Sequence, residues 1–215
     1  MSTGRDVLHA VKKSSSAHQP TLSIPIGHPI EAVLRPIGTV RESLRETDVI
    51  ALTEWRNRYG SAFLTEFHAT KERTERWLLD HVGNDETRLL FMVDDLAGDT
   101  IAYMGLAFID WRKKSGEADA IVRGKATRPG FMTLALGTLL RWSRNQLGLQ
   151  RLGVRVRSDN PALEFYQKFG FSEVRRVCLR RDDVDGETHL VPDDSLRSAQ
   201  LQLVYMELKG DSWGN

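Results

Sequence analysis

The chain has 215 residues, of which 27% are charged and 40% hydrophobic, and its formal net charge at pH 7 is +1. This balance gives no general attraction to nucleic acid or to an anionic membrane surface, and the length suits one full-sized domain. A single cysteine, Cys178, excludes a disulfide within the chain, and no apolar run approaches the roughly 18 residues of a membrane span. The N-terminus also lacks the apolar core of a signal peptide, so we expect a cytoplasmic protein.

The first part of the chain differs from the rest. Residues 1–30 show no sustained hydrophobic period and contain three prolines. We interpret them as a flexible or extended N-terminal arm that precedes a domain over residues 31–210. The alternation of Leu22, Ile24 and Ile26 leaves a second interpretation open, in which this arm packs on a partner subunit.

The remaining elements follow from hydrophobic periodicity and from turn and capping residues. Strands are expected at residues 32–37, 89–93, 101–109, 117–122, 152–156, 173–180 and 201–208. Helices are expected from Thr47 or Asp48 to residue 58, from Thr70 onward, over 131–147, and between Asn160 and Gly170. Residues 182–199 are expected to form a long polar loop. This order predicts an α/β fold with a mixed, mostly antiparallel sheet of about seven strands and helices on both faces.

One stretch combines a strand, a glycine turn and a helix start. The strand that ends at Val122 continues through a turn at residues 124–130 into the helix that begins at Phe131. The N–H groups of a first helical turn have no partner within the helix, and the helix dipole adds about half a positive charge there. The sequence therefore predicts an anion-binding site at this helix start.

The element order and a motif after the next strand resemble the GNAT superfamily of acyl-CoA-dependent N-acyltransferases, over residues 34–208. The family's Asn-x-x-Ala-x-x-x-Tyr-x-Lys-x-Gly-Phe element is matched, with the alanine one position early, by Asn160, Ala162, Tyr166, Lys168, Gly170 and Phe171. Asn160 and Gly170 would also serve as plain helix caps, but capping does not explain the tyrosine. The resemblance implies the GNAT fold, with a V-shaped splay between two strands, and acetyl-CoA or another acyl-CoA as co-substrate.

A second, partial match concerns the family's Gln/Arg-x-x-Gly-x-Gly/Ala turn, which grips the pyrophosphate of CoA. Gly130 takes the first glycine position, whereas Thr127 stands where Gln or Arg is usual and Met132 where the second Gly or Ala is usual. These departures leave backbone N–H groups as the main expected contacts. The cofactor-binding residues that the resemblance implies are Ile121, Val122, Arg128, Gly130, Phe131, Met132, Thr133 and Asn160.

The resemblance also assigns roles in the reaction. In the family, the strands that correspond to residues 119–123 and 152–157 part, and the pantetheine arm lies between them. Tyr166 would then protonate the departing thiolate, and the N–H groups of Ile121 and Val122 would hold the oxyanion. A phenol pKa of about 10 and a thiol pKa of about 8.5 make the proton transfer nearly matched. The alternative for Tyr166 is a core tyrosine whose hydroxyl is satisfied elsewhere.

Three residues are candidates to take the proton of the attacking amine. Glu117 and Asp119 are two apart on one strand, so they face the same side. His68 follows the first expected helix. Weak bases that act through water suffice for an amine of lowered pKa, such as that of an amino sugar. The alternatives are a solvated strand edge for the two acids and a surface or helix-capping role for His68.

The first expected helix carries candidates for binding the acceptor. The segment around Trp55 and Arg56 is similar to the branch of GNATs that acetylates nucleotide-linked amino sugars, and also to protein N-terminal acetyltransferases. Arg56 is either a ligand for a nucleotide diphosphate or a partner of Glu54 in a surface ion pair. Trp55 is either a stacking platform or a core residue, and Trp111 is a candidate to stack a base or to wall the pocket.

We therefore expect an N-acyltransferase that acetylates the amine of a nucleotide-linked amino sugar by direct attack on acetyl-CoA. The alternatives are N-terminal acetylation of a protein or peptide, and a non-catalytic acyl-CoA-binding module. The acidic loop over residues 182–199 would suit a cationic amine better than a nucleotide diphosphate. The six histidines show no ligand spacing, so no metal is expected. A small-molecule amine is the expected partner, nucleic acid and membrane are not, and a homodimer is left open.

Overall fold

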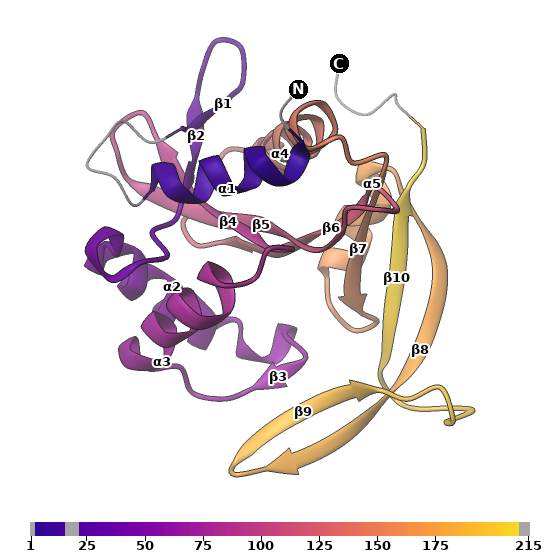
Figure 1. The fold of residues 1–215 in the computed structure, drawn as a ribbon. Helices are drawn as coiled ribbons and strands as arrows, with labels where there is room; N and C mark the ends of the chain where they lie inside the picture. The colour runs from indigo at the N-terminus through magenta and orange to yellow at the C-terminus, as the bar shows by residue number, and fades with distance from the viewer. Residues whose placement is uncertain (1–2, 16–21, 211–215) are drawn as a thin grey trace.

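The computed structural model describes residues 3–15 and 22–210 (Figure 1). The helices are α1 Gly4–Ser14, η1 Arg41–Ser43, α2 Glu46–Arg58, η2 Gly60–Ala62, α3 Lys71–Arg76, the π-helical continuation η3 Trp77–Gly83, α4 Phe131–Leu147 and α5 Ala162–Phe169. The strands are β1 Ile24–Ile26, β2 Ala32–Pro36, β3 Thr65–Glu66, β4 Leu89–Asp95, β5 Thr100–Asp110, β6 Ser115–Arg123, β7 Arg151–Arg157, β8 Phe171–Val184, β9 Glu187–Pro192 and β10 Gln202–Leu208. None of the helices in these residues is long and apolar enough to cross a membrane.

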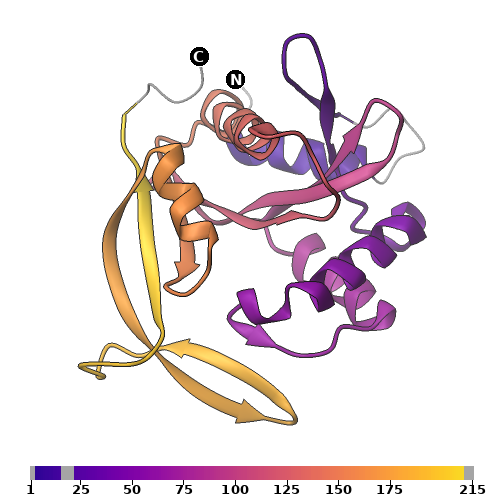
Figure 2. The same cartoon turned by 180° about the vertical axis from the view of Figure 1, so that it is seen from behind.

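The ten strands found in the described residues form one sheet in the order β1-β2-β4-β5-β6-β7-β10-β8-β9-β3. Neighbours are antiparallel except β6 and β7, which run parallel. Helices α1 and α4 lie on one face of the β4–β6 part of the sheet, and α2 and α3 lie on the other (Figures 1 and 2). The predicted α/β fold with a mixed, mostly antiparallel sheet is confirmed, although the structure has ten strands rather than about seven.

Apolar side chains form a separate core on each face of the sheet. Successive strand residues point to opposite faces, so Phe91 of β4 joins the core under α1 and α4, whereas Met92 joins the core under α2. Leu136 of α4 lies in the first of these cores, and Trp55 of α2 and Tyr103 of β5 lie in the second. Strands β5 and β6 therefore have packed helices on both sides.

A buried ion-pair network attaches α2 to the sheet. The guanidinium of Arg35 on β2 donates two hydrogen bonds of 2.9 Å to Asp48 of α2 and also binds Asp94 of β4. All three side chains are buried, so each charge depends on the others for compensation. Asp48 was an expected helix cap, but α2 begins at Glu46 and Asp48 faces the sheet. This network fixes the helix that carries Trp55.

The N-terminal segment is not the extended arm that its composition predicts. Thr3 caps α1 by accepting a hydrogen bond from the Asp6 N–H, and Leu8 and Val11 are buried against the main core. Residues 24–26 pair with β2. The prediction was wrong here because it did not use the capping box of Thr3 and Asp6, and because so short a helix is marginal without its packing on α4. The other arm residues, 1–2 and 16–21, lie outside the described residues.

The predicted polar loop over residues 182–199 is also partly wrong. Strand β8 continues to Val184, turns at Asp185 and Gly186, both with positive φ, and returns as β9. Thr188 and His189 of β9 then pair with β3, which lies between α2 and α3 in the chain. The β8–β9 hairpin extends away from the body of the sheet in Figure 1. Through β3, this hairpin is connected to the α2–α3 side of the molecule.

Candidate active site

The parallel strands β6 and β7 part halfway along their length. They pair from Ser115 with Arg151 to Ala118 with Val154, and no further partners follow, although both strands continue. An opening therefore lies between residues 119–123 of β6 and the end of β7. This is the V-shaped splay that the resemblance implies.

A bulge shapes β6 where the splay begins. Asp119 lies opposite Gly105 and Val122 opposite Tyr103, so β6 places two residues where β5 places one. One of the two, Ala120, has φ +52°, a left-handed conformation that is uncommon outside glycine. A bulge leaves its extra residue outside the regular ladder, so backbone groups around Ile121 are not all used by β5. This is the position predicted to supply oxyanion N–H donors.

The start of α4 has the features of an anion site. Gly130 has φ +79° in the left-handed region, which suits glycine, and no side chain caps the helix that follows. The first turn, which includes Phe131, Met132 and Thr133, carries no acidic residue. The Phe131 N–H donates to the Arg128 carbonyl at 3.2 Å, so the free N–H groups of this turn are those of Met132 and Thr133. These groups and the helix dipole meet no competing negative charge there. The pyrophosphate of CoA fits this chemistry.

Arg128 stands beside that helix start, but an acidic residue already holds it. Its guanidinium binds both oxygens of Glu31, at 2.7 and 2.6 Å. The pair is exposed, and the Glu31 carboxylate raises the pKa of Arg128. A phosphate at this helix start would compete with Glu31 for the guanidinium. The cofactor-binding role of Arg128 stays a prediction.

Tyr166 rises from α5 on the β7 side of the splay. Its ring packs edge-on against Phe165 and Phe171, and only 7% of the residue is exposed. Its hydroxyl has no hydrogen bond to any residue within 3–15 and 22–210, and the oxygen is not among the atoms that are fully buried and unpaired. Burial, and secondly the charge of Asp119, raise the pKa of Tyr166. The phenol therefore stays protonated, and no described residue occupies its hydroxyl.

The two candidate acids on β6 are each held by an arginine. Glu117 forms an ion pair with Arg155 of β7, in which Nη2 donates to Oε1 at 2.9 Å. Burial raises the pKa of Glu117, and Arg155 opposes that effect. Asp119 accepts a hydrogen bond of 2.7 Å from Arg88, which lies just before β4. The other oxygen of Asp119 has no partner in the described part of the chain, so Asp119 has the freer carboxylate.

The sequence interpretation missed these arginines and an exposed aromatic residue beside them. Phe108 of β5 is 50% exposed and has φ +53°, and the Arg155 guanidinium lies 3.9 Å above its ring. Their positions give no signal in one sequence, because partners 30 or more residues away become neighbours only in the sheet.

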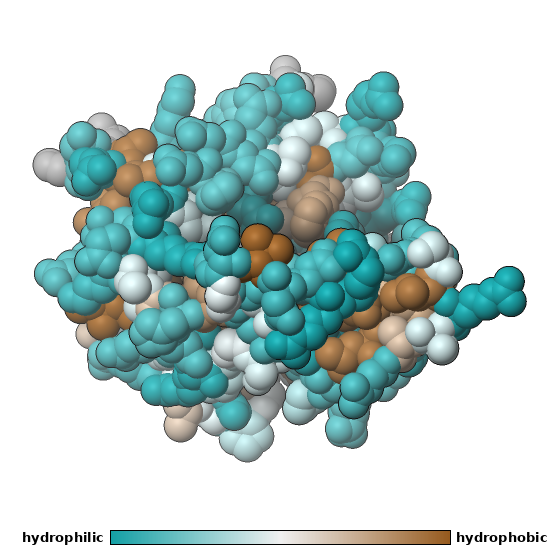
Figure 3. Space-filling view, turned by 90° about the horizontal axis from the view of Figure 1, so that it is seen from below, coloured by the Kyte–Doolittle hydropathy of each residue, from teal (hydrophilic) through white to brown (hydrophobic). Residues whose placement is uncertain are grey.

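The surface in Figure 3, which views the molecule from the α2, α3 and β9 side, is largely hydrophilic with separate apolar patches.

Arg56 and Trp55 lie deeper than a surface platform would. The guanidinium of Arg56 packs over the rings of Phe63 and Phe67, 3.8 and 4.6 Å from their centroids, and donates to the Thr65 carbonyl. Its Nη1 is fully buried without a partner, and burial lowers the pKa of Arg56. Trp55 is 4% exposed and stacks on Tyr103, so it is a core residue in the structure.

Three other predicted residues, Trp111, His68 and Asn160, either lie away from the parted strands or have a local structural role. Trp111 follows β5 near the paired end of β6 and β7, packs on the α4-side core, and keeps its indole Nε1 buried and unpaired. His68 is exposed in the segment after β3. The Asn160 side chain accepts from the Ala162 N–H at 2.9 Å and donates to the Ala62 carbonyl, so it caps α5. The roles predicted for them draw no support from these positions.

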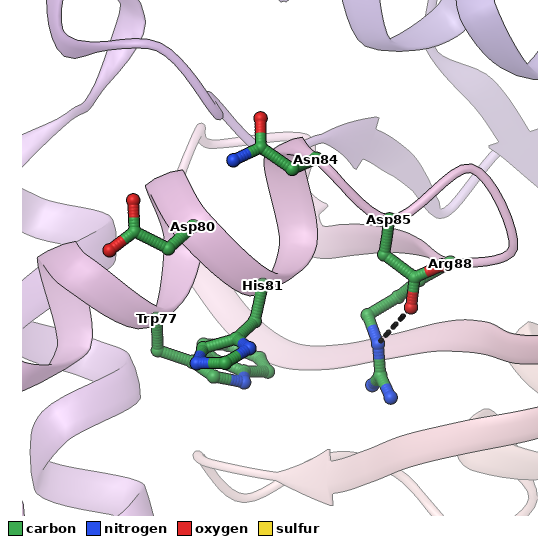
Figure 4. A pocket seen from close by; sticks show the side chains of 6 residues that line it. All are labelled: Trp77, Asp80, His81, Asn84, Asp85 and Arg88. Carbon is green, nitrogen blue, oxygen red and sulfur yellow. Dashed lines mark ion pairs between the residues drawn. The ribbon is translucent and has the colours of Figure 1, made fainter.

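A pocket of about 480 Å³ lies beside η3 (Figure 4). Trp77 and His81 point from the helix in one direction, and Asp80 and Asn84 point another way. Asp85 and Arg88 complete the lining, and an Asp85 carboxylate oxygen lies 3.5 Å from the Arg88 Nε. The same guanidinium forms an ion pair with Asp119. Arg88 thus links this pocket to Asp119 of β6. No group of three or more metal-ligating side chains occurs within residues 3–15 and 22–210.

The structure thus combines two parallel strands that part halfway with an uncapped helix start suited to an anion. The chain matches the family model described as Acetyltransferase (GNAT) domain over residues 39–172. It therefore belongs to the GNAT acetyltransferase family, whose members use acetyl-CoA, and it is an N-acyltransferase.

Solved structures share the fold at low sequence identity. A GCN5-related N-acetyltransferase from Brucella melitensis has a TM-score of 0.62 and 20% identity, covering 88% of this chain and 79% of its own. A spermidine N-acetyltransferase from Vibrio cholerae in complex with CoA and spermine has a TM-score of 0.61 and 19% identity, covering 83% and 95%. No curated protein sequence matches the chain.

Proposed function

We propose that this protein transfers an acetyl group from acetyl-CoA to a primary amine by direct attack at the parted end of β6 and β7. The observation that supports the proposal most is the loss of pairing between β6 and β7 after Ala118 and Val154, next to a bulge in β6 and followed in the chain by the uncapped start of α4. The charge of Asp119 on β6 also acts on Tyr166 of α5. Acetyl-CoA would supply the activated acetyl group as a thioester. Backbone N–H groups of Gly130, Met132 and Thr133 would bind the phosphates, and those near Ile121 and Val122 would stabilise the oxyanion.

Two protons must move for the reaction to balance. The amine forms the new N–C bond and loses one proton, and the C–S bond breaks. Asp119, with one oxygen free, is the candidate to bind the amine and pass its proton to water. Glu117 is a weaker candidate because Arg155 occupies it. Tyr166 gives its proton to the departing sulfur and regains one from solvent.

We further propose that the acceptor amine belongs to a small molecule that also carries negative charge, and a nucleotide-linked amino sugar is the first to test. The two acids of β6, Glu117 and Asp119, are each already paired with an arginine. An anionic group on the acceptor can share Arg88 or Arg155. Spermidine is the second candidate, because structural neighbours include spermidine N-acetyltransferases. The homodimer stays a prediction.

The experiment is thiol release from acetyl-CoA with three acceptors: a UDP-linked amino sugar, spermidine, and a short peptide with a free N-terminus. The proposal expects the highest kcat/KM with the amino sugar. Highest activity with spermidine would favour the second candidate, and highest activity with the peptide would favour N-terminal acetylation. Absence of acceptor-dependent release with all three would overturn the proposed function.

A further inference from the structure

Tyr103 of β5 has no role in the reaction proposed above, yet its hydroxyl is left unpaired. Its ring stacks on Trp55, with centroids 6.0 Å apart and planes 9° apart, and the residue is 3% exposed. The hydroxyl has no hydrogen bond to any residue that the structure describes, and its oxygen is not among the fully buried, unpaired atoms. Because buried phenols normally find a partner, a rigid and almost fully buried ring whose hydroxyl has none points to an external partner.

The register of β5 and β6 puts Tyr103 next to the reaction centre. Tyr103 lies directly opposite Val122, and Gly105 lies opposite Asp119. Tyr103 and Asp119 are therefore diagonal neighbours across the bulge, a separation that long side chains bridge. Gly105 has no side chain to stand between them. Tyr103 and Val122 belong to the same core, which places Tyr103 on the α2 side of the sheet.

Asp119 acts electrostatically on two phenols. Its charge raises the pKa of Tyr103 and the pKa of Tyr166, in both cases after the larger effect of burial. Arg56 lies within range of Tyr103 as well and has the opposite effect on its pKa. Arg88 holds one Asp119 oxygen and leaves the other free. Asp119 of β6 therefore lies within electrostatic range of Tyr103 on β5 and of Tyr166 on α5.

We propose that the Tyr103 hydroxyl and the free oxygen of Asp119 together bind the acceptor amine. The inference rests on the proposed function and adds a residue to it. A primary amine presents N–H donors, and a phenol oxygen and a carboxylate accept them. Tyr103 fixes the incoming nitrogen on the α2 side of the splay, while Tyr166 on α5 serves the departing sulfur. The rigid stack on Trp55 holds the Tyr103 oxygen in position without a protein partner.

Steady-state thiol release with Tyr103→Phe tests the proposal, using the UDP-linked amino sugar and spermidine as acceptors. Loss of one hydrogen bond to a charged group predicts a fall of about 10- to 100-fold in kcat/KM for the amine. The KM for acetyl-CoA should not change, and neither should the melting temperature, because the ring still stacks on Trp55. Tyr205→Phe is the matched control, since β10 is two strands away from β6, and it should behave as wild type.

A second measurement does not depend on turnover. In protein labelled with ¹³Cζ-tyrosine, the Tyr103 signal, assigned with Tyr103→Phe, should shift in Asp119→Asn. It should also shift when either acceptor is added to the CoA complex. Wild-type kinetics in Tyr103→Phe would overturn the inference alone and leave the proposed function intact. Absence of thiol release by the wild type would overturn the proposed function. Independently of turnover, the inference is overturned if the Tyr103 chemical shift is the same in wild type and Asp119→Asn and does not change when either acceptor is added.

Discussion

The two sides of the parted strands offer their proposed ligands different kinds of group. On the donor side, which we define as β6 residues 121–122 and the α4 start at 130–133, the proposed contacts are backbone N–H groups. On the acceptor side, defined as Tyr103, Glu117 and Asp119 with their arginines, the proposed contacts are side chains. Backbone N–H groups are present whatever side chain a residue carries. Recognition by the backbone is therefore compatible with Thr127 and Met132, which depart from the family pattern. Side-chain recognition makes the acceptor side particular to this chain.

The largest effect is expected where both sides meet, at Tyr166. Tyr166→Phe should lower kcat by roughly 10²- to 10⁴-fold, because the departing thiolate loses its proton donor. The KM values for acetyl-CoA and for the amine should change little, since the ring contacts with Phe165 and Phe171 remain. Steady-state kinetics measure this effect. An unchanged kcat would remove Tyr166 from the acid role.

Gly124 lies against the ring of Trp55, the residue on which Tyr103 stacks. A Cβ at this position would lie 2.0 Å from the Trp55 ring, so Gly124→Ala must push that ring against Tyr103. Overpacking of this kind costs about 1–3 kcal/mol of unfolding free energy. Thermal and denaturant unfolding measure it, with Gly60→Ala as control because nothing lies near a Cβ there. Equal stability of the two variants would contradict the close contact.

Lys12 connects the two faces of the sheet away from the site. Its Nζ donates to the carbonyls of Val82 and Asp85, at 2.6 and 2.7 Å, so Lys12→Met should destabilise the fold by about 1 kcal/mol without changing kcat.

The effect of this substitution should also depend on pH. Burial lowers the pKa of Lys12 from 10.5 to about 8. Between pH values of about 8 and 10.5, the unfolded chain therefore binds more protons than the folded chain. Stability of the wild type relative to Lys12→Met should therefore rise with pH across that window. Urea unfolding at pH 7.5 and at pH 10 measures the difference, and a fall would contradict the lowered pKa.

Arg128 should give the smallest effect, because the donor side depends little on side chains. An exposed ion pair contributes about 0.2–1 kcal/mol, so Arg128→Ala should raise the KM for acetyl-CoA only by roughly 2- to 5-fold. Glu31→Gln, which frees the guanidinium, should leave that KM equal or lower. A rise well above tenfold in Arg128→Ala would mean that this side chain, rather than the backbone, carries phosphate binding.

The failures of the sequence interpretation share a physical cause. The helix at residues 131–147 and the main strands were predicted because each carries its own periodic pattern and caps. The helix α1 and the strands β3 and β9 were missed because they are short or polar and gain stability from partners far away in the chain. Trp55 was left open between core and platform, and only the packing of Gly124 and Tyr103 against it decides for the core.

The sequence by itself determined the chemistry that a single local stretch can encode: a glycine turn into an uncapped helix, a strand on each side of it, and a tyrosine at a family position. The tertiary structure decided which side chains face that chemistry. Arg88, Arg155 and Tyr103 reach the acids of β6 only because β4, β5, β6 and β7 lie side by side. Such contacts depend on register and on the bulge at Ala120, which no local pattern specifies.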